Sequence, residues 1–315
     1  MTLLRAPGTS KGAARGSLLH EVARRTFGPP SASMRAMQGK TVMITGATSG
    51  IGTETARALA DKGARVVMIN RNPQKAEGVA EDLRKTATGS IELVRGDMSS
   101  FSSIREAAAE VLERYPKIDV FISNAGVFRA RRHETTDGLE EVFAVNHLAP
   151  FLLTNLLLER LRASAQSRIV IVASDAHRGA VLDFDNLLLQ RRFNAWTAYS
   201  RSKLSNVMFT YALARRLEGS GVTANCLHPG FVATRLGSGN KIPIRPVYIL
   251  LKPFTISPKK GAETSVYLAS APEVEGVNGK YFDRKEESRS SRVSLEEEPQ
   301  ELLWKMSAEL TGIDS

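Results

Sequence analysis

Two side chains in the second half of the chain, Tyr199 and Lys203, have the types and the spacing for proton transfer. Apolar residues recur through residues 204–213, with no proline or glycine before Gly219, so a helix is predicted there. Residues four apart stack on one face of a helix. An ammonium beside a phenol stabilises phenolate, so we expect the pKa of Tyr199 to be lowered. The tyrosine could then exchange a proton with an oxygen on a reacting carbon.

The same spacing occurs at Tyr281 and Lys285, where it carries less weight. This pair follows Gly279 in a short run that is typical of a terminal strand entering a polar tail. On an extended chain, residues four apart are separated by roughly 13 Å, which is beyond direct contact. We therefore interpret this second pair as structural.

A glycine-rich turn near residue 50 has the arrangement that binds the pyrophosphate of a dinucleotide. Residues 41–45 form an apolar run typical of a buried strand, and a helical pattern follows the turn as far as Gly63. Glycines let the backbone approach the ligand, and a helix N-terminus offers free N–H groups and a positive dipole end. Alone this is a weak signal, because glycine turns precede many helices. The residues predicted to hold the pyrophosphate are Gly46, Thr48, Ser49, Gly50, Ile51 and Gly52.

The end of the next predicted strand, residues 65–70, indicates which dinucleotide is bound. Where an NAD site carries an acidic residue for the ribose hydroxyls, this chain has Asn70, Arg71 and Asn72. A guanidinium suits a 2′-phosphate, so the sequence favours NADP(H) and leaves NAD(H) as an alternative. The structural interpretation of Arg71 is an ordinary solvated surface arginine.

Other predicted strands also end in residues suited to a ligand, since ligands of such sheets bind outside the carboxyl ends of the strands. Residues 168–173 are followed by Ser174, which could polarise a substrate carbonyl there. Residues 119–123 are followed by small residues that leave room for a flat ligand. The residues at these and the remaining strand ends are Asp97, Asn124, Ala125, Gly126, Ser174, Pro229 and Gly230.

A predicted helix over residues 138–162 contains Asn146 and, four residues later, Pro150. Proline removes a helical hydrogen bond, so the helix should be kinked or distorted there. A carbonyl freed near Asn146 could hold a water. The alternative is that Asn146 is a polar side chain satisfied by local hydrogen bonds.

Composition places the chain among ordinary globular proteins. It has 315 residues, of which 42% are apolar and 24% charged, enough for one large domain with a sizeable core. Its net charge is +10, and residues 1–38 supply half of it. This uneven charge does not require nucleic acid, because a phosphate-bearing cofactor is a sufficient partner. The single cysteine, Cys226, leaves no internal disulfide and no multi-cysteine metal site, and no apolar run is long enough for a transmembrane helix.

Three regions follow from the patterns along the chain. Residues 1–38 are expected to be a flexible basic leader, either an organelle transit peptide or a plain extension. Residues 39–283 alternate strands and helices, which predicts a parallel sheet with helices on both faces. Within them, residues 231–260 are expected to be a lid or binding loop whose apolar content suits an apolar substrate. Residues 284–315 should be a polar, mobile tail followed by a short helix over residues 302–310.

Taken in order, the motifs resemble those of the short-chain dehydrogenase/reductase family of the classical type, over roughly residues 39–283. The likeness is strongest to the retinol dehydrogenases, in the runs DVFISNAGVF, FAVNHL, RIVIVASDAH, YSRSKLSN and LHPG. It implies a single Rossmann-type doubly wound parallel sheet of about seven strands. It also implies four catalytic residues and a cofactor channel. The catalytic residues are Asn146 to hold a water, Ser174 to polarise the substrate oxygen, Tyr199 as general acid/base and Lys203 to lower the pKa of Tyr199; the further cofactor contacts are Lys203 on the ribose, Asp97 near the adenine, and Asn124 and Gly126 along the channel.

The resulting hypothesis is an NADP(H)-dependent oxidoreductase of apolar aldehydes, ketones or alcohols, with a retinoid-like compound as one candidate substrate. One alternative is a regulatory protein that senses the cofactor and turns over little. Another is a light-driven reductase of the protochlorophyllide type, against which the single cysteine counts. A cytoplasmic location is expected, or a mitochondrial or other organellar one if residues 1–38 are a transit peptide. Peripheral membrane contact and a homo-oligomer are compatible with the sequence.

Overall fold

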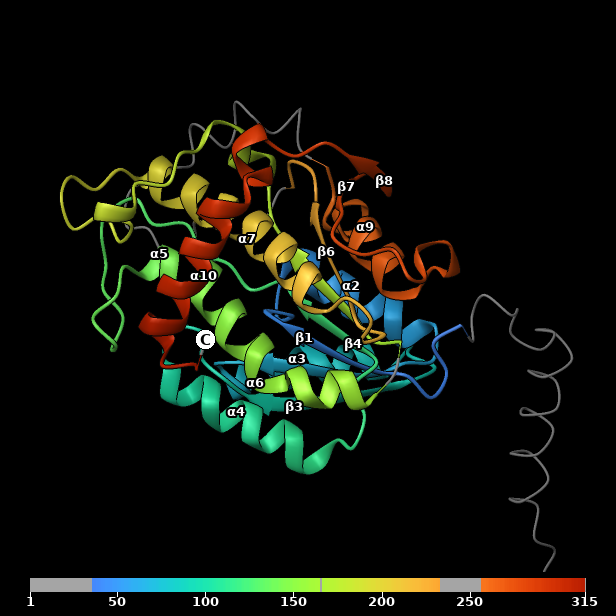
Figure 1. The fold of residues 1–315 in the computed structure, drawn as a ribbon. Helices are drawn as coiled ribbons and strands as arrows, with labels where there is room; N and C mark the ends of the chain where they lie inside the picture. The colour runs from blue at the N-terminus through green and yellow to red at the C-terminus, as the bar shows by residue number, and fades with distance from the viewer. Residues whose placement is uncertain (1–35, 165, 233–255, 315) are drawn as a thin grey trace, which may run out of the picture.

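The structure is a computed structural model that describes residues 36–164, 166–232 and 256–314. Most of the expected leader and residues 233–255 of the expected lid lie outside the described residues. The described residues form one α/β unit, in which a single sheet lies between two layers of helices (Figure 1).

The sheet has eight strands in the order β3-β2-β1-β4-β5-β6-β7-β8. The first seven are parallel, and β8 pairs antiparallel with β7, so the sheet has one strand more than the sequence predicts. The order reverses between β1 and β4, which opens a crevice for a ligand at the carboxyl ends of these strands. The strands are β1 (Thr41–Thr45), β2 (Arg65–Asn70), β3 (Ser90–Arg95), β4 (Val120–Ser123), β5 (Arg168–Val172), β6 (Thr223–His228), β7 (Tyr281–Asp283) and β8 (Glu286–Ser288).

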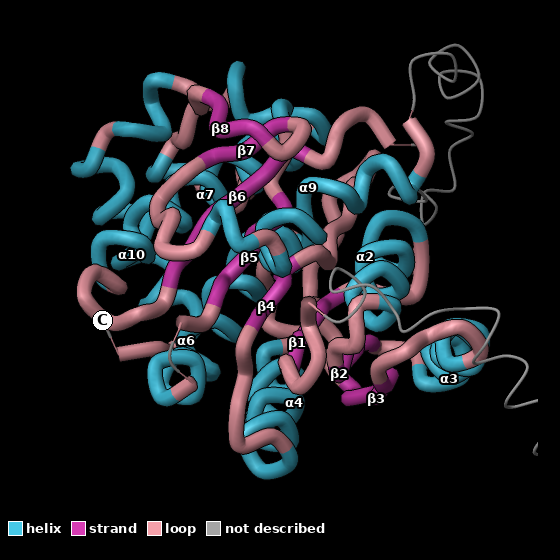
Figure 2. Tube along the Cα trace, turned by 90° about the vertical axis from the view of Figure 1, so that its right-hand side faces the viewer, coloured by secondary structure: helices cyan, strands magenta, loops and turns pink. Residues whose placement is uncertain are grey.

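Both faces of the sheet are buried, because side chains on a strand point alternately to opposite sides. Val42 and Ile44 of β1 face the layer of α2, α3 and α9, whereas Met43 faces the layer of α4, α6 and α7. Figure 2 shows these two layers on opposite sides of the strands. The helices are α2 (Gly50–Asp61), α3 (Pro73–Arg84), α4 (Phe101–Arg114), α6 (Ala149–Ala163), α7 (Ala195–Arg216) and α9 (Pro258–Ser270).

The predicted distortion near Pro150 is present as a π-helical turn, Ala144–Leu148, between the short helix α5 (Glu141–Phe143) and α6. Pro150 has no N–H, so the carbonyl of Asn146 lacks its α-helical donor. The stretch Glu141–Ala163 is long and apolar enough to cross a membrane by length and composition, but most of it is buried. Its burial between the sheet and other helices is that of a core helix.

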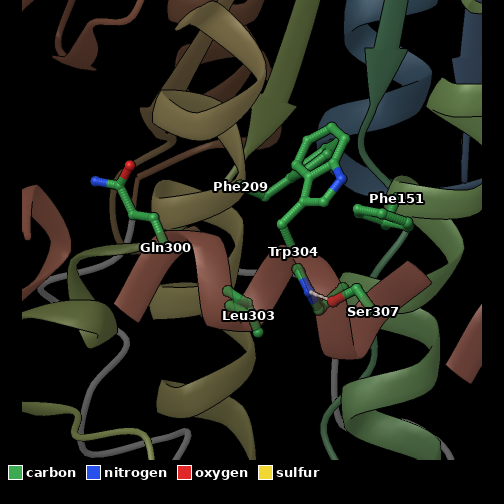
Figure 3. A pocket seen from close by; sticks show the side chains of 7 residues that line it. Phe151, Phe209, Gln300, Leu303, Trp304 and Ser307 are labelled. Carbon is green, nitrogen blue, oxygen red and sulfur yellow. Dashed lines mark hydrogen bonds between the residues drawn. The ribbon is translucent and has the colours of Figure 1, made fainter. Parts of the chain in front are cut away.

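The end of the chain is more regular than the sequence predicts. Residues expected to form a polar, mobile tail contain β8, a 3-10 turn (Arg292–Leu295) and the start of α10 (Glu297–Thr311). Figure 3 shows Trp304 of α10 beside Phe151 and Phe209, and its ring centroid lies 4.9 Å and 5.7 Å from theirs. The Arg216 guanidinium lies 3.9 Å from the centroid of the Trp304 ring. An aromatic anchor with a cation over it therefore holds α10 against α6 and α7.

The buried imidazole of His147 contributes to this docking, since its Nε2 lies 2.9 Å from the Ser307 hydroxyl of α10. Burial lowers the pKa of His147 to about 3, against about 6.5 in an unfolded chain. As the pH falls, the unfolded state therefore binds a proton that the folded state does not bind. The stabilisation from a neutral, buried His147 is fully present above the unfolded pKa and is lost as the pH falls below it.

We expect the free energy of unfolding to fall between about pH 6.5 and about pH 5 by about 2 kcal/mol more in the wild type than in His147→Gln. The reason is that only the wild type must protonate a buried imidazole. Urea denaturation at the two pH values measures the difference. Equal pH slopes for the two proteins would contradict a buried neutral His147.

Candidate active site

Helix α7 carries the predicted phenol and amine. It begins after Asn194, whose side chain accepts a hydrogen bond from the Thr197 N–H at 2.9 Å. Lys203 is buried, and its ammonium donates to the Val172 carbonyl at the end of β5 at 2.9 Å. The same nitrogen lies 5.7 Å from the centroid of the Tyr199 ring. Burial lowers the pKa of Lys203 to about 8, and the contact with Val172 fixes α7 across the end of β5.

Tyr199 and Ser174 meet at the carboxyl edge of the sheet. The Ser174 hydroxyl lies near enough to the Tyr199 phenol to act on its pKa. Tyr199 is partly exposed, and burial of its phenol raises its pKa, while the Ser174 hydroxyl acts in the opposite direction. We expected Lys203 to lower the pKa of Tyr199, and this lowering is not seen. The Lys203 ammonium lies beside the Tyr199 ring and donates to the Val172 carbonyl.

Asn146 links the loop after β4 to the catalytic helix. Its side-chain oxygen accepts from the Val127 N–H at 2.7 Å, and its nitrogen donates to the Val127 carbonyl and to the Ser202 hydroxyl, both at 3.0 Å. Ser202 in turn donates to the Tyr199 carbonyl at 2.7 Å. The Asn146 side chain is thus satisfied by local hydrogen bonds, which was the alternative interpretation. Only the backbone carbonyl of Asn146 could hold a water. Sequence reasoning missed Ser202, although a buried serine three residues after the tyrosine was a usable signal.

The glycine turn is built by close packing against the end of β4. Asn124 donates from its side chain to the carbonyls of Thr45 and Gly46 at 3.0 Å and 3.1 Å. The Thr45 hydroxyl accepts from the N–H groups of Asn124 and Ala125, both at 3.1 Å. A Cβ atom on Gly52 would lie 2.4 Å from the Gly46 carbonyl oxygen, so glycine is required there. In the described part of the chain, the N-cap residue Ser49 makes no side-chain hydrogen bond to α2, which leaves the first N–H groups of the helix available to an anion.

A dinucleotide fits the residues around this turn. Asn70, at the end of β2, is buried, and neither its side-chain oxygen nor its nitrogen has a hydrogen-bond partner among the described residues. Buried polar groups are nearly always paired, so an unpaired amide at a strand end indicates a missing ligand. Exposed Arg71 follows it, and Asp97 stands at the end of β3, where its carboxylate accepts from the Ser99 N–H and hydroxyl at 2.9 Å and 2.7 Å. The adenosine end of a dinucleotide would lie here.

All the residues predicted from the sequence lie at or near the carboxyl edge of the sheet, or on the helix that crosses it. Thr48, Ser49, Gly50 and Ile51 belong to the turn or to the first turn of α2. Ala125 and Gly126 follow β4, and Pro229 and Gly230 follow β6. Gly230 has φ +84°, which favours glycine. Among the residues that the structure describes, no group of three or more His, Cys, Asp or Glu side chains could hold a metal ion.

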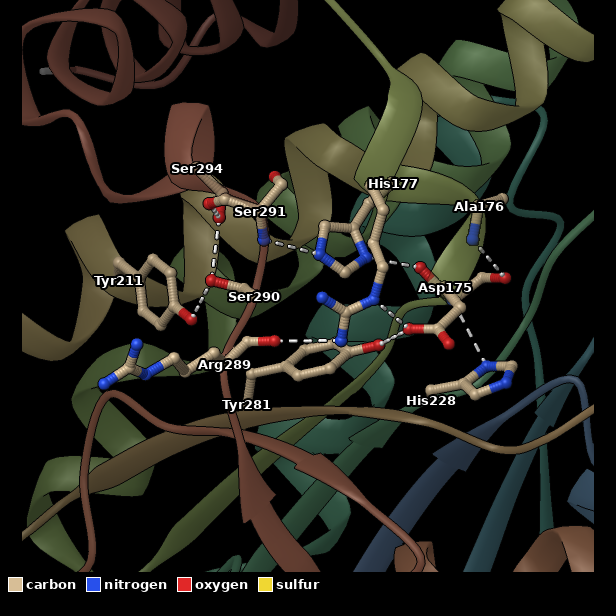
Figure 4. Close-up of polar contacts among 12 residues, drawn as sticks. Asp175, Ala176, His177, Tyr211, His228, Tyr281, Arg289, Ser290, Ser291 and Ser294 are labelled. Carbon is tan, nitrogen blue, oxygen red and sulfur yellow. Dashed lines mark hydrogen bonds and ion pairs between the residues drawn. The ribbon is translucent and has the colours of Figure 1, made fainter.

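The pair at Tyr281 and Lys285 is structural, as interpreted from the sequence. The Tyr281 hydroxyl donates to the Asp175 carboxylate at 2.9 Å, whereas the Lys285 ammonium lies 3.4 Å from Glu263. Asp175 itself, directly after Ser174, was missed by sequence reasoning. It has polar contacts with Arg178, His228 and Tyr281, and His177 bonds to the Ser174 carbonyl beside it (Figure 4). Burial lowers the pKa values of both histidines in this set.

Comparison with known proteins gives a consistent result. Residues 40–241 match the family model described as short chain dehydrogenase. The chain is 42% identical to human retinol dehydrogenase 14 over 324 aligned positions, with 96% of each chain covered. It is 43% identical to human retinol dehydrogenase 13, with 90% of this chain and 88% of that one covered. A crystal structure of a putative uncharacterized protein from Mycobacterium paratuberculosis is 33% identical, with a TM-score of 0.74, and covers 90% of this chain and 97% of its own.

We expect Gly52→Ala to cost about 1–3 kcal/mol of stability, because its methyl group would collide with the Gly46 carbonyl oxygen. It should also weaken NADPH binding by roughly tenfold or more, since the turn would shift. Gly78→Ala on α3 is the matched control, because a Cβ there meets nothing within 4 Å. Calorimetric binding and urea denaturation of both variants check this, and a Gly52→Ala protein with wild-type NADPH affinity would contradict the assignment of the turn.

Proposed function

Because the chain belongs to the short-chain dehydrogenase family, we propose that it interconverts apolar carbonyl compounds and alcohols with NADP(H). Its membership makes it an oxidoreductase related to the retinol dehydrogenases. One observation carries the proposal furthest. The Ser174 hydroxyl and the Tyr199 phenol lie together at the carboxyl edge of the sheet, and the Lys203 ammonium lies 5.7 Å from the centroid of the Tyr199 ring.

The pair can act on a carbonyl oxygen as two converging donors. The Tyr199 phenol donates its proton as negative charge develops on that oxygen, and the Ser174 hydroxyl stabilises the same charge. In the reverse direction Tyr199 accepts the proton of an alcohol. When bound, the nicotinamide supplies a hydride to the carbonyl carbon or receives one from the alcohol.

Lys203 supports this proton transfer from behind the phenol. Its pKa of about 8 leaves it largely protonated at neutral pH, so a positive charge lies on the Tyr199 side of the site. Its bond to the Val172 carbonyl leaves further N–H donors for the ribose of a bound cofactor. The Asn146 carbonyl is available to hold a water for proton exchange with the bulk.

The preference for NADP(H) rests on the end of β2. Arg71 is exposed, and the unpaired amide of Asn70 lies directly before it. A guanidinium can hold a 2′-phosphate by two charge-assisted hydrogen bonds. The carboxylate that would bind the ribose hydroxyls of NAD is absent from this position.

An apolar substrate is supported by the aromatic side chains around the phenol. Trp196 is 60% exposed, and its ring lies 6.3 Å from that of Tyr199. Phe128 packs edge-on to the same ring at 5.8 Å. Phe231, soon after the end of β6, is 70% exposed, and its ring lies 6.1 Å from that of His228. An exposed aromatic group beside a reactive phenol suits a flat apolar molecule. Relatives named retinol dehydrogenases agree with this substrate class.

Tyr199→Phe should lower kcat for aldehyde reduction by about 10²- to 10⁴-fold, because the proton donor is lost while the ring remains. NADPH binding should be retained. Tyr267→Phe on α9 is the control for loss of a tyrosine hydroxyl elsewhere. The assay follows NADPH oxidation with a panel of apolar aldehydes and ketones.

Each alternative has its own outcome in that assay. Full activity of Tyr199→Phe would refute the proposed acid/base. NADPH binding by the wild type without turnover of any compound would favour a regulatory cofactor sensor, and turnover only in light would favour the tetrapyrrole reductase.

Arg71→Ala should weaken NADPH binding by roughly ten- to hundredfold and leave NADH binding unchanged, because hydrogen bonds to charged groups contribute about 1.5–3 kcal/mol. Lys85→Ala, at the far end of α3, removes a comparable exposed cation as the control. Calorimetric titration with both nucleotides measures the ratio. Equal losses for the two nucleotides would show that Arg71 does not contact the 2′-phosphate.

A further inference from the structure

His177 lies in the turn directly after Ser174 and is fully buried. Its Nδ1 lies 2.7 Å from the Ser174 carbonyl oxygen, and its Nε2 accepts the backbone N–H of Ser291 at 3.0 Å. A backbone N–H can only donate, so Nε2 carries no proton and Nδ1 is the protonated nitrogen that donates to Ser174. One neutral imidazole thus joins the proposed catalytic serine to a residue 114 positions after the histidine.

The segment that receives this bond, residues 289–291, has two further anchors. The Arg289 carbonyl accepts from the Arg178 guanidinium at 2.8 Å, next to His177 in the same turn. The Ser290 hydroxyl accepts from the Tyr211 phenol at 2.7 Å. Tyr211 belongs to α7, the helix that carries Tyr199 and Lys203. Residues 289–291 therefore contact the turn after Ser174 on one side and the catalytic helix on the other (Figure 4).

The turn after Ser174 also contacts two strands of the sheet, β6 and β7. Asp175 accepts from the Tyr281 hydroxyl of β7 at 2.9 Å, and its N–H donates to Nδ1 of His228 at the end of β6 at 3.2 Å. The Tyr281 ring lies 4.9 Å from the His177 ring. These contacts fix the base of the turn against the strands. The contacts of residues 289–291 add a direct connection from the turn to α7.

We propose that His177 is a positioning residue for Ser174. Residues 289–291 hold His177 in place and connect the turn after Ser174 to helix α7. The inference rests on the function proposed above, because it concerns the pair of oxygens that would meet the substrate. The Ser174 hydroxyl counteracts the burial that raises the pKa of the Tyr199 phenol. Displacing Ser174 removes this counteraction and weakens both donors to the substrate oxygen. The contacts of the adenosine end of NADPH, at the ends of β2 and β3, are unaffected.

Two substitutions separate the two bonds of the imidazole. In His177→Asn the amide can reach the Ser174 carbonyl but not Ser291, whereas in His177→Gln it can reach Ser291 but not Ser174. We expect each to lower kcat by about ten- to hundredfold with little change in KM or in NADPH affinity. Ser290→Ala, which removes the link to Tyr211, is a milder variant and should lower kcat in the same way. His133→Gln, at an exposed histidine, is the matched control and should leave kcat unchanged.

A second measurement does not depend on turnover. The phenolate absorbance of Tyr199 is titrated as the difference between each protein and its Tyr199→Phe counterpart. The pKa of Tyr199 should rise by about one unit in His177→Asn and His177→Gln, as expected for the loss of about 1.4 kcal/mol of phenolate stabilisation by the displaced Ser174 hydroxyl. The pH profile of kcat should move in the same direction.

Wild-type kcat and an unshifted phenol titration in the three folded variants would overturn the proposal. A lower melting temperature with unchanged kcat and unchanged titration would also overturn it, because the histidine would then be only structural. If the wild type reduces no carbonyl compound, the proposed function fails. The phenol titration still decides whether His177 positions Ser174.

Discussion

The buried hydrogen bond between the Lys203 ammonium and the Val172 carbonyl is the contact on which the arrangement of the site depends. An amine removed from water must be paired, and the last carbonyl of β5 is the partner that the fold offers. Pairing it fixes where α7 crosses the sheet, and therefore where Tyr199 stands relative to Ser174, two residues after Val172. Because the strands are parallel, the glycine turn and the carboxyl ends of the strands lie at the same edge of the sheet. The position of the buried Lys203 amine thus determines where Tyr199 and Ser174 lie relative to the cofactor crevice.

The electrostatics of the site are balanced by opposing effects. Burial acts against charge on both the phenol and the amine, raising the pKa of Tyr199 and lowering that of Lys203. The Ser174 hydroxyl favours phenolate and so partly reverses the effect of burial on Tyr199. A proton donor that is neutral at rest and stabilised as an anion by a neighbour is suited to act in both directions of a redox reaction. The orientation of Ser174 is therefore as important as the presence of the phenol.

Much of the site could be predicted from the sequence, because it depends on interactions between residues close together in the chain. Helical period places Tyr199 near Lys203, and steric limits explain Gly52. The effect of Pro150 on its helix follows from its missing N–H. Contacts between distant segments could not be predicted, and the bond from Ser291 to His177 is the clearest case. The pKa of Tyr199 was predicted in the wrong direction, because sequence spacing gives the neighbour of a side chain but not its burial.

The start of α10 shows a different kind of failure. Three glutamates and Pro299 made residues 296–299 resemble a polar tail. Acidic residues and proline are also favoured in the first turn of a helix, where they complement the dipole and need no N–H donor. What decides between the two is the apolar surface of α6 and α7 that receives Trp304, and the sequence does not show that surface.

Transfer of deuterium from NADPH labelled at the reactive carbon of its nicotinamide to an apolar aldehyde tests the central claim most directly. The account predicts an alcohol that carries the deuterium on its carbinol carbon and a solvent proton on its oxygen. An alcohol without the label, or no alcohol at all from any apolar carbonyl compound, would contradict it.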